Sequence, residues 1–262
     1  MSTNLLTTDL IYLFFLIMAR YLGIFLITPI FSSRIIQRRV KVILAFLMAI
    51  ITFLLSYQKA GITAPNTDLG VILYLVKELS IGVFMGFIIY IFFAAIQLAG
   101  QFIDLRMGFR IGNVVDPLSG ASSPIIGQFQ NIFTVLVFLS INGHLVVINS
   151  LYKSFDVIPI GQVTYNNNLW QLLFRRSADL FLIGFKIALP IMGTLFIVDV
   201  LLGFLARSVP QMNIFIVGLP LKIVIGFILL LLSFEILIYY FSDILNNGLS
   251  ELVNIINILG SG

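Results

Sequence analysis

The sequence predicts an all-α, multi-helix membrane protein built from long helical hairpins, and three observations support this class. Hydrophobic residues make up 60% of the 262 residues and charged residues only 10%, whereas soluble domains carry about 25% charged residues. The apolar residues gather into six runs. Each run is close to the ~20 residues with which a helix crosses the hydrocarbon core of a bilayer.

Each apolar run predicts one helix. In chain order the helices cover about residues 10–31, 40–57, 69–98, 125–152, 180–204 and 214–242. Polar connectors join them, and we expect the tail at 246–262 to lie at the membrane interface. The first connector has no acidic residue and contains Arg34, Arg38, Arg39 and Lys41. By the positive-inside rule this connector faces the cytoplasm, which leaves the N-terminus on the other side.

Ionisable residues lie well inside four of the runs. They are Arg20, Lys77, Glu78, Lys186, Asp199, Lys222 and Glu235. Each one costs about 2.5–3.5 kcal/mol at a lipid-exposed helix centre. For any single residue, snorkelling or pairing with a neighbouring helix is the ordinary explanation. Taken together, and with several glycines that permit close helix packing, they indicate a subunit of a larger assembly.

Residues for catalysis or for metal binding are scarce. The chain has no cysteine, and His144 is its single histidine, which we expect to be a hydrogen-bonded structural residue. No nucleotide-binding, zinc-protease or serine-hydrolase motif is present. Asp104, Asp116 and Asp156 lie in connectors, where solvated or capping carboxylates are usual. We therefore expect no catalytic residue, no metal, no cofactor and no enzymatic activity. The net charge of +4 forms no basic stripe for nucleic acid.

Two prolines inside apolar runs raise an alternative function. Pro190 and Pro220 are compatible with the broken helices of a small-solute secondary transporter, or with an ion channel. Against this alternative, the sequence has no detectable inverted repeat, and proline also kinks helices in structural proteins.

The third connector is long, polar and rich in glycine. Gly108, Gly112 and Gly120 would let it bend back into a helical bundle. Such irregular backbone is tolerated at membrane depth where it lines water or is buried in protein. Met107, Phe109 and Ile111 would then provide an apolar stopper. An exposed surface loop is the alternative that the composition leaves open.

Several blocks give the chain a resemblance to a known family. "AGQFIDLRMGFRIGNVVDP", "INGHLVVINSLYKSFDVIPIG" and above all "LLGFLARSVPQMNIFIVGLPLKIVIGF" resemble the FliR family of flagellar type III export-gate membrane proteins, homologous to the SpaR/YscT injectisome proteins. The resemblance runs from about Asp9 to about Leu252. Its most specific part is Arg207–Asn213, and "FIVGLPLK" favours the flagellar branch.

The resemblance implies an architecture and a set of partners. Residues 1–179 would be a FliP-like portion and residues 180–262 a FliQ-like helical hairpin. The subunit would assemble with FliP, FliQ and FlhB-like proteins in the bacterial inner (cytoplasmic) membrane, within the flagellar basal body. Unfolded flagellar proteins would be the exported substrates. The family often has proline where this chain has Gln37, a departure that bears on the rigidity of the first connector.

The resemblance also implies a plug for the export channel, formed by the connector at 106–127. The plug residues expected from it are Met107, Gly108, Phe109, Arg110, Ile111, Gly112, Asp116 and Pro117. Arg106 and Arg110 place charge in a plug expected to be mostly apolar. Either they point toward Asp104 and Asp116, or ion pairs hold the plug in part.

The last two runs predict a hairpin with a polar tip and paired charges. Arg207, Pro210, Gln211 and Asn213 would contact a partner subunit at the tip; a solvated turn is the alternative. Counted from the turn between residues 210 and 211, Asp199 is level with Lys222, and Lys186 is level with Glu235. Opposite charges at equal depth would offset much of the cost of burying them. Helix phase places the two pairs on different sides.

Overall fold

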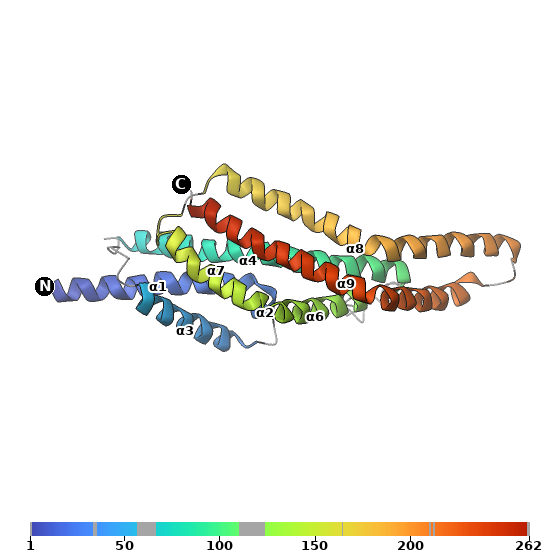
Figure 1. Ribbon diagram of the computed structural model, residues 1–262, viewed down its shortest axis with the longest axis horizontal. Coiled ribbons are helices and arrows are strands. Elements are labelled where there is room, and N and C mark those ends of the chain that lie inside the picture. Colours follow the sequence, from blue (N-terminus) through green and yellow to red (C-terminus); the bar gives the residue numbers. More distant parts are fainter. Residues whose placement is uncertain are drawn as a thin grey trace. The chain divides into compact units, whose positions relative to one another are not determined.

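The computed structural model describes residues 2–33, 36–56, 67–109, 124–163, 165–209, 211 and 213–260. Within these ranges the chain is helical and contains no strand, so the predicted all-α class is confirmed. The helices are α1 (Ser2–Ile27), α2 (Pro29–Ser32), α3 (Arg38–Ser56), α4 (Asp68–Met107), α6 (Ile125–Ser140), α7 (Gly143–Val157), α8 (Asn167–Ser208) and α9 (Ile214–Gly260) (Figure 1).

The number of membrane-capable helices differs from the six predicted. Four described helices are long and apolar enough to cross a bilayer: Asp9–Ile27, α4, α8 and Ile216–Gly260. The predicted fourth helix is broken into α6 and α7, which meet at 67° and count as a fifth span only if taken together. The break occurs where Asn142 adopts a left-handed conformation (φ 58°) just before Gly143. The second run forms α3, which is not among these candidates.

Three helices extend well beyond their apolar runs. α4 starts where expected, with the Thr67 hydroxyl accepting the N–H of Gly70 (3.3 Å), but continues at its other end to Met107. α8 begins earlier than expected, at Asn167, where the side-chain oxygen of Asn166 accepts the N–H of Leu169 (3.0 Å). Such contacts satisfy N–H groups that have no partner within the helix. The tail predicted at the interface continues α9 as far as Gly260. This segment forms helix because one side of it packs into the core, where Leu252, Ile255 and Leu259 are fully buried.

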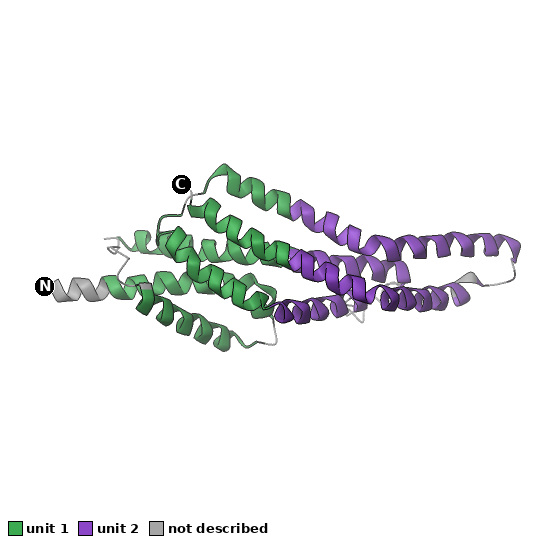
Figure 2. Cartoon of the chain, viewed as in Figure 1, with its two compact units in different colours: residues 1–91, 142–176, 246–262 green, residues 92–141, 177–245 purple. Residues whose placement is uncertain are grey.

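The chain divides into two compact units, coloured separately in Figure 2. Unit 1 contains residues 1–91, 142–176 and 246–262; unit 2 contains residues 92–141 and 177–245. The boundary passes through α4, α8 and α9, so each of these helices contributes to both units.

In unit 1, α1 and α4 touch backbone to backbone. A Cβ atom on Gly23 would lie 2.3 Å from the carbonyl oxygen of Leu79, and one on Gly82 would lie 2.1 Å from that of Arg20. The close packing expected at glycines is therefore present at this crossing. α3 packs on the other side of α1, where the Phe14 ring meets that of Phe46 at 5.3 Å.

We expect Gly82→Ala to destabilise the protein by about 1–3 kcal/mol, the usual cost of overpacking. The added methyl group would meet helix backbone, which cannot rotate away as a side chain can. Gly203→Ala is the matched control, since a Cβ there meets nothing within 4 Å and alanine favours helix by about 1 kcal/mol. Thermal unfolding of the two variants checks the difference. Equal stability would show that the crossing tolerates side chains.

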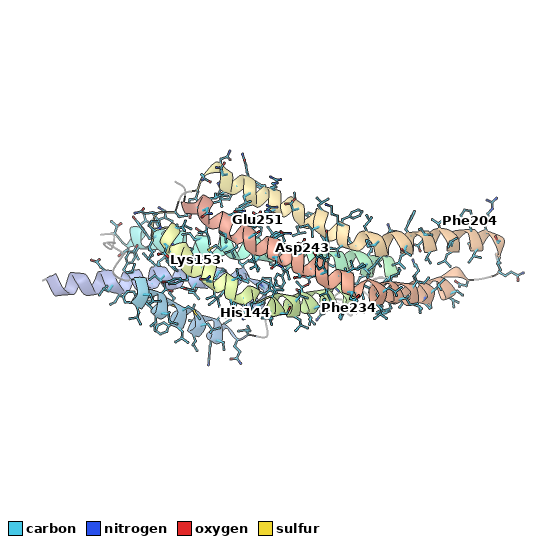
Figure 3. The ribbon with its side chains drawn as sticks, viewed as in Figure 1. His144, Lys153, Phe204, Phe234, Asp243 and Glu251 are labelled. Carbon is cyan, nitrogen blue, oxygen red and sulfur yellow. The ribbon has the colours of Figure 1, made fainter. Side chains whose placement is uncertain are left out.

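In unit 2, the second half of α4 packs against α6, α8 and α9. A Cβ on Gly184 of α8 would lie 2.9 Å from the carbonyl oxygen of Ala95, and one on Gly100 would lie 2.5 Å from the Cα of Gly127 at the start of α6. At the other end of the unit, Phe204 is 66% exposed near the end of α8 (Figure 3). Unit 2 therefore has a tightly packed base and an exposed, apolar helical hairpin.

His144 lies at the start of α7 (Figure 3). Its Nδ1 is buried without a hydrogen-bond partner, so the hydrogen bond expected there does not form at this nitrogen. Across the described ranges, no group of three or more His, Cys, Asp or Glu residues is placed to hold a metal ion.

Candidate functional site

A buried carboxylate lies where the glycine-rich connector leaves α4. Asp104 is fully buried. Its Oδ1 accepts the N–H of Ile126 and its Oδ2 that of Gly127, both at 3.0 Å. These N–H groups belong to the first turn of α6, which has no intrahelical acceptors for them and carries a partial positive charge. The carboxylate therefore caps α6 from another helix.

Met107, Gly108 and Phe109 form the base of the connector. Met107 is fully buried, and a Cβ on Gly226 of α9 would lie 2.7 Å from its terminal methyl. Gly108 ends α4 in a left-handed conformation (φ 86°), and the N–H of Phe109 then reaches the carbonyl oxygen of Asp104 (3.2 Å). The Phe109 ring lies edge-on to Phe227 at 6.1 Å. The other predicted plug residues, Arg110, Ile111, Gly112, Asp116 and Pro117, lie outside the described residues.

Arg106 points away from Asp104. Its guanidinium lies 5.9 Å from the ring centroid of Phe196 on α8, a cation–π distance. No ion pair joins it to Asp104, whose oxygens face α6. The sequence indicated a capping carboxylate as one ordinary role for Asp104, but gave no signal that the capped helix would lie across the connector.

In the hairpin, Lys222 and Asp199 meet at the depth that their spacing from the turn gives them. The Lys222 ammonium lies 2.7 Å from Oδ1 of Asp199, and both side chains are partly exposed. No ion pair forms between Lys186 and Glu235, although both lie within the described ranges.

Other helices hold α8 and α9 at the level of the second charge pair. On α8, the Phe185 ring packs against Phe102 of α4 at 6.4 Å. On α9, the Phe234 ring packs against Phe133 of α6 at 4.8 Å. Lys186 and Glu235 remain exposed on the hairpin. The depth argument therefore fails here because it assumed that only the two hairpin helices contact each other.

Reversing one charge tests the pair that forms. We expect Lys222→Asp to impair assembly, because it places two carboxylates side by side, and Asp199→Lys in the same chain to restore it in part. The coupling should be about 0.2–1 kcal/mol, as for partly exposed pairs. Thermal unfolding of the single and double variants measures the coupling, and complex yield or motility reports assembly. Lys186→Glu combined with Glu235→Lys is the control, for which we expect no such coupling within the chain. Rescue in the control alone would contradict the assignment.

The hairpin tip is short and polar. α8 ends at Ser208 and α9 begins at Ile214, and the N–H of Ile216 reaches the carbonyl oxygen of Asn213 (3.1 Å). Arg207, Gln211 and Asn213 are exposed, and Pro210 is outside the described residues.

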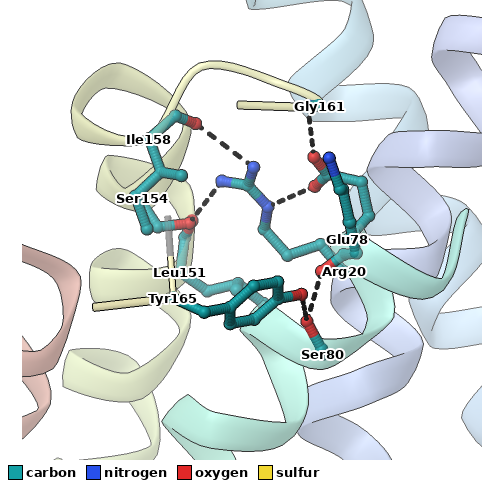
Figure 4. A network of polar contacts seen from close by, with 9 residues as sticks. Arg20, Glu78, Ser80, Leu151, Ser154, Ile158, Gly161 and Tyr165 are labelled. Atoms are coloured by element: carbon teal, nitrogen blue, oxygen red, sulfur yellow. Dashed lines mark hydrogen bonds and ion pairs between the residues drawn. The ribbon is translucent and has the colours of Figure 1, made fainter. Parts of the chain in front are cut away.

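Unit 1 contains a second buried polar centre, formed by Arg20 of α1 and Glu78 of α4 (Figure 4). Both side chains are fully buried, and Nε of Arg20 donates to Oε2 of Glu78 at 2.7 Å. The guanidinium also donates to the Ser154 hydroxyl (3.1 Å) and the Ile158 carbonyl (3.2 Å). The other oxygen of Glu78 accepts the N–H of Gly161 (2.7 Å). Two charges within apolar runs thus connect α1 and α4 to the end of α7 and the turn after it.

Comparison with known proteins identifies the class. A family model described as "Bacterial export proteins, family 1" matches residues 11–248. The chain belongs to this family of export proteins, and the family predicted from the sequence is confirmed. Its long apolar helices make it a membrane protein.

The relatives cover nearly the whole chain. The flagellar biosynthetic protein FliR of Bacillus subtilis (strain 168) is 34% identical over 255 residues, covering 96% of this chain and 97% of the relative. FliR of Escherichia coli (strain K12) is 33% identical over 82% of this chain and 81% of the relative. The surface presentation of antigens protein SpaR of Shigella flexneri is 27% identical over 86% and 85%. None of these names describes an enzymatic activity.

Proposed function

We propose that the chain is a structural, channel-forming subunit of the flagellar type III protein export gate, with residues 106–127 as a plug that helps keep the channel closed. The observation that carries the proposal is similarity over almost the full length to flagellar FliR proteins. The base of the connector supports the plug in particular. Both ends of the connector are fixed, by Met107 on one side and by the Asp104 cap of α6 on the other.

Within this proposal the partners are FliP, FliQ and FlhB-like subunits in the bacterial inner membrane, and the substrates are unfolded flagellar proteins. Residues 1–179 correspond to the FliP-like portion and residues 180–262 to the FliQ-like hairpin. Exposed apolar surface supports a hetero-oligomer: only 11% of the most apolar stretch of α9 is buried within the chain. An apolar groove of about 380 Å³ also lies between α6 and α9, beside Phe133 and Phe234.

Purification from the membrane tests this function. We expect the chain to co-purify in a large complex with the other gate subunits, because much of the apolar surface of its helices is not buried by the rest of the chain. Cysteines introduced at Gln211 or Asn213 should crosslink to FliQ-like or FlhB-like subunits, since both residues are exposed at the tip of the hairpin. The chain has no native cysteine to interfere. A stable monomer or symmetric homo-oligomer would instead support a transporter or channel.

A further inference from the structure

We propose that Asp104 is a positioning residue that ties together the two ends of the connector, and that this tie is needed to keep the channel closed. The inference rests on the proposed gate function and adds a residue that the predicted plug did not include.

Asp104 makes hydrogen bonds on both sides of the connector. On the outgoing side, its backbone carbonyl accepts the N–H of Phe109 at 3.2 Å. On the returning side, its two carboxylate oxygens accept the N–H groups of Ile126 and Gly127. One residue therefore fixes where the chain leaves α4 and where it enters α6.

The charge of Asp104 makes this contact hard to replace. The carboxylate is fully buried, and no lysine or arginine in the described part of the chain forms an ion pair with it. The negative charge of Asp104 is stabilised instead by the two N–H groups and by the positive end of the α6 dipole. If the start of α6 moved away, a buried charge would be left without partners, which is strongly unfavourable. The carboxylate therefore holds the start of α6 in one position.

The backbone around the tie is built for close approach. A Cβ on Gly100, one turn before Asp104, would lie 2.5 Å from the Cα of Gly127. The first turn of α6 can reach the carboxylate because both helices have glycine where they meet. A capping residue with a purely local role needs no such approach between separate helices.

Replacing the hydrogen bonds by a covalent bond tests the inference in the intact complex. Asp104→Cys removes the carboxylate, and Asp104→Cys combined with Ile126→Cys tests a reversible disulfide at the same contact, whose formation is checked by mass spectrometry; the chain has no other cysteine. Membrane conductance and small-dye uptake are measured under oxidising and reducing conditions. We expect the single variant to leak at least about tenfold more than wild type, corresponding to about 1.4 kcal/mol. The double variant should be closed when oxidised and leak when reduced.

The matched control is Asp68→Cys, an exposed carboxylate at the start of the same helix, for which we expect no leak. A closed Asp104→Cys complex, or a double variant that leaks as much with the disulfide formed as after its reduction, overturns the inference. If Asp104→Cys does not assemble, Asp104→Asn, which keeps one acceptor oxygen, is measured instead, and a closed complex overturns the inference.

These outcomes are distinguished from failure of the proposed plug by replacing the connector itself. If replacing the connector causes a leak and the Asp104 variants do not, the inference about Asp104 fails and the plug stands. If connector replacement causes no leak, the proposed plug fails.

Discussion

Replacing residues 111–122 by a short Gly-Ser linker should leave the complex assembled but let ions and small molecules cross the membrane. The change spares the contacts at the base of the connector, where Met107 packs on Gly226 and Phe109 on Phe227. If the plug favours the closed state by a few kcal/mol, the open state is populated at about 0.1–10%. Its removal should therefore raise conductance by roughly 10- to 1,000-fold.

The control for this prediction is the same linker in place of residues 58–65, between α3 and α4, which should leave the membrane closed. Conductance of cells that produce each complex, together with their sensitivity to small toxic molecules, provides the measurement. A connector variant that exports normally and leaks no more than wild type would show that residues 106–127 do not form the plug.

Replacing Arg20 by leucine should destabilise unit 1 by about 3–5 kcal/mol, the usual cost of leaving one charge of a buried ion pair without its partner. Glu78 would keep the N–H of Gly161 as its remaining partner, and the hydroxyl of Ser154 and the carbonyl of Ile158 would lose their donor. Thermal unfolding and the yield of folded chain in lipid or detergent measure the effect.

Removing both charges at once separates the charge effect from a packing effect. Arg20→Leu with Glu78→Leu should recover part of the lost stability, because no uncompensated charge then remains. Lys77→Met is the control, since Lys77 is partly exposed and its ammonium lies 5.4 Å from the Tyr74 ring. A double variant less stable than Arg20→Leu would show that the polar contacts, and not the unpaired charge, dominate.

The fold class was predictable from the sequence because composition and apolar runs act locally. The helix ends were not. α8 begins at Asn167, behind the Asn166 cap, and α4 continues to Met107, and both extensions cover polar residues that hydropathy assigns to connectors. The break at Asn142 was missed although Asn142 and Gly143 form a turn-favouring dipeptide, because the apolar residues on both sides of it read as one run.

At the candidate sites, spacing along the chain is informative where one helix hairpin alone sets the contact. Asp199 and Lys222 meet because the turn alone fixes their relative depth. Lys186 and Glu235 do not, because α4 and α6 also pack against the hairpin at that level. The cap that Asp104 provides depends on the approach of two separate helices, and neither spacing nor composition contains that information.

The length of α9 has a consequence for the life of the chain in the cell. Its 47 residues rise about 70 Å along the helix, more than twice the ~30 Å of bilayer hydrocarbon, so much of its apolar surface cannot be covered by lipid. A newly made chain without its partners would therefore expose apolar surface of this helix to water. We expect such orphan chains to be degraded or to aggregate, so that the cellular amount of this protein follows the supply of its partners instead of its own synthesis.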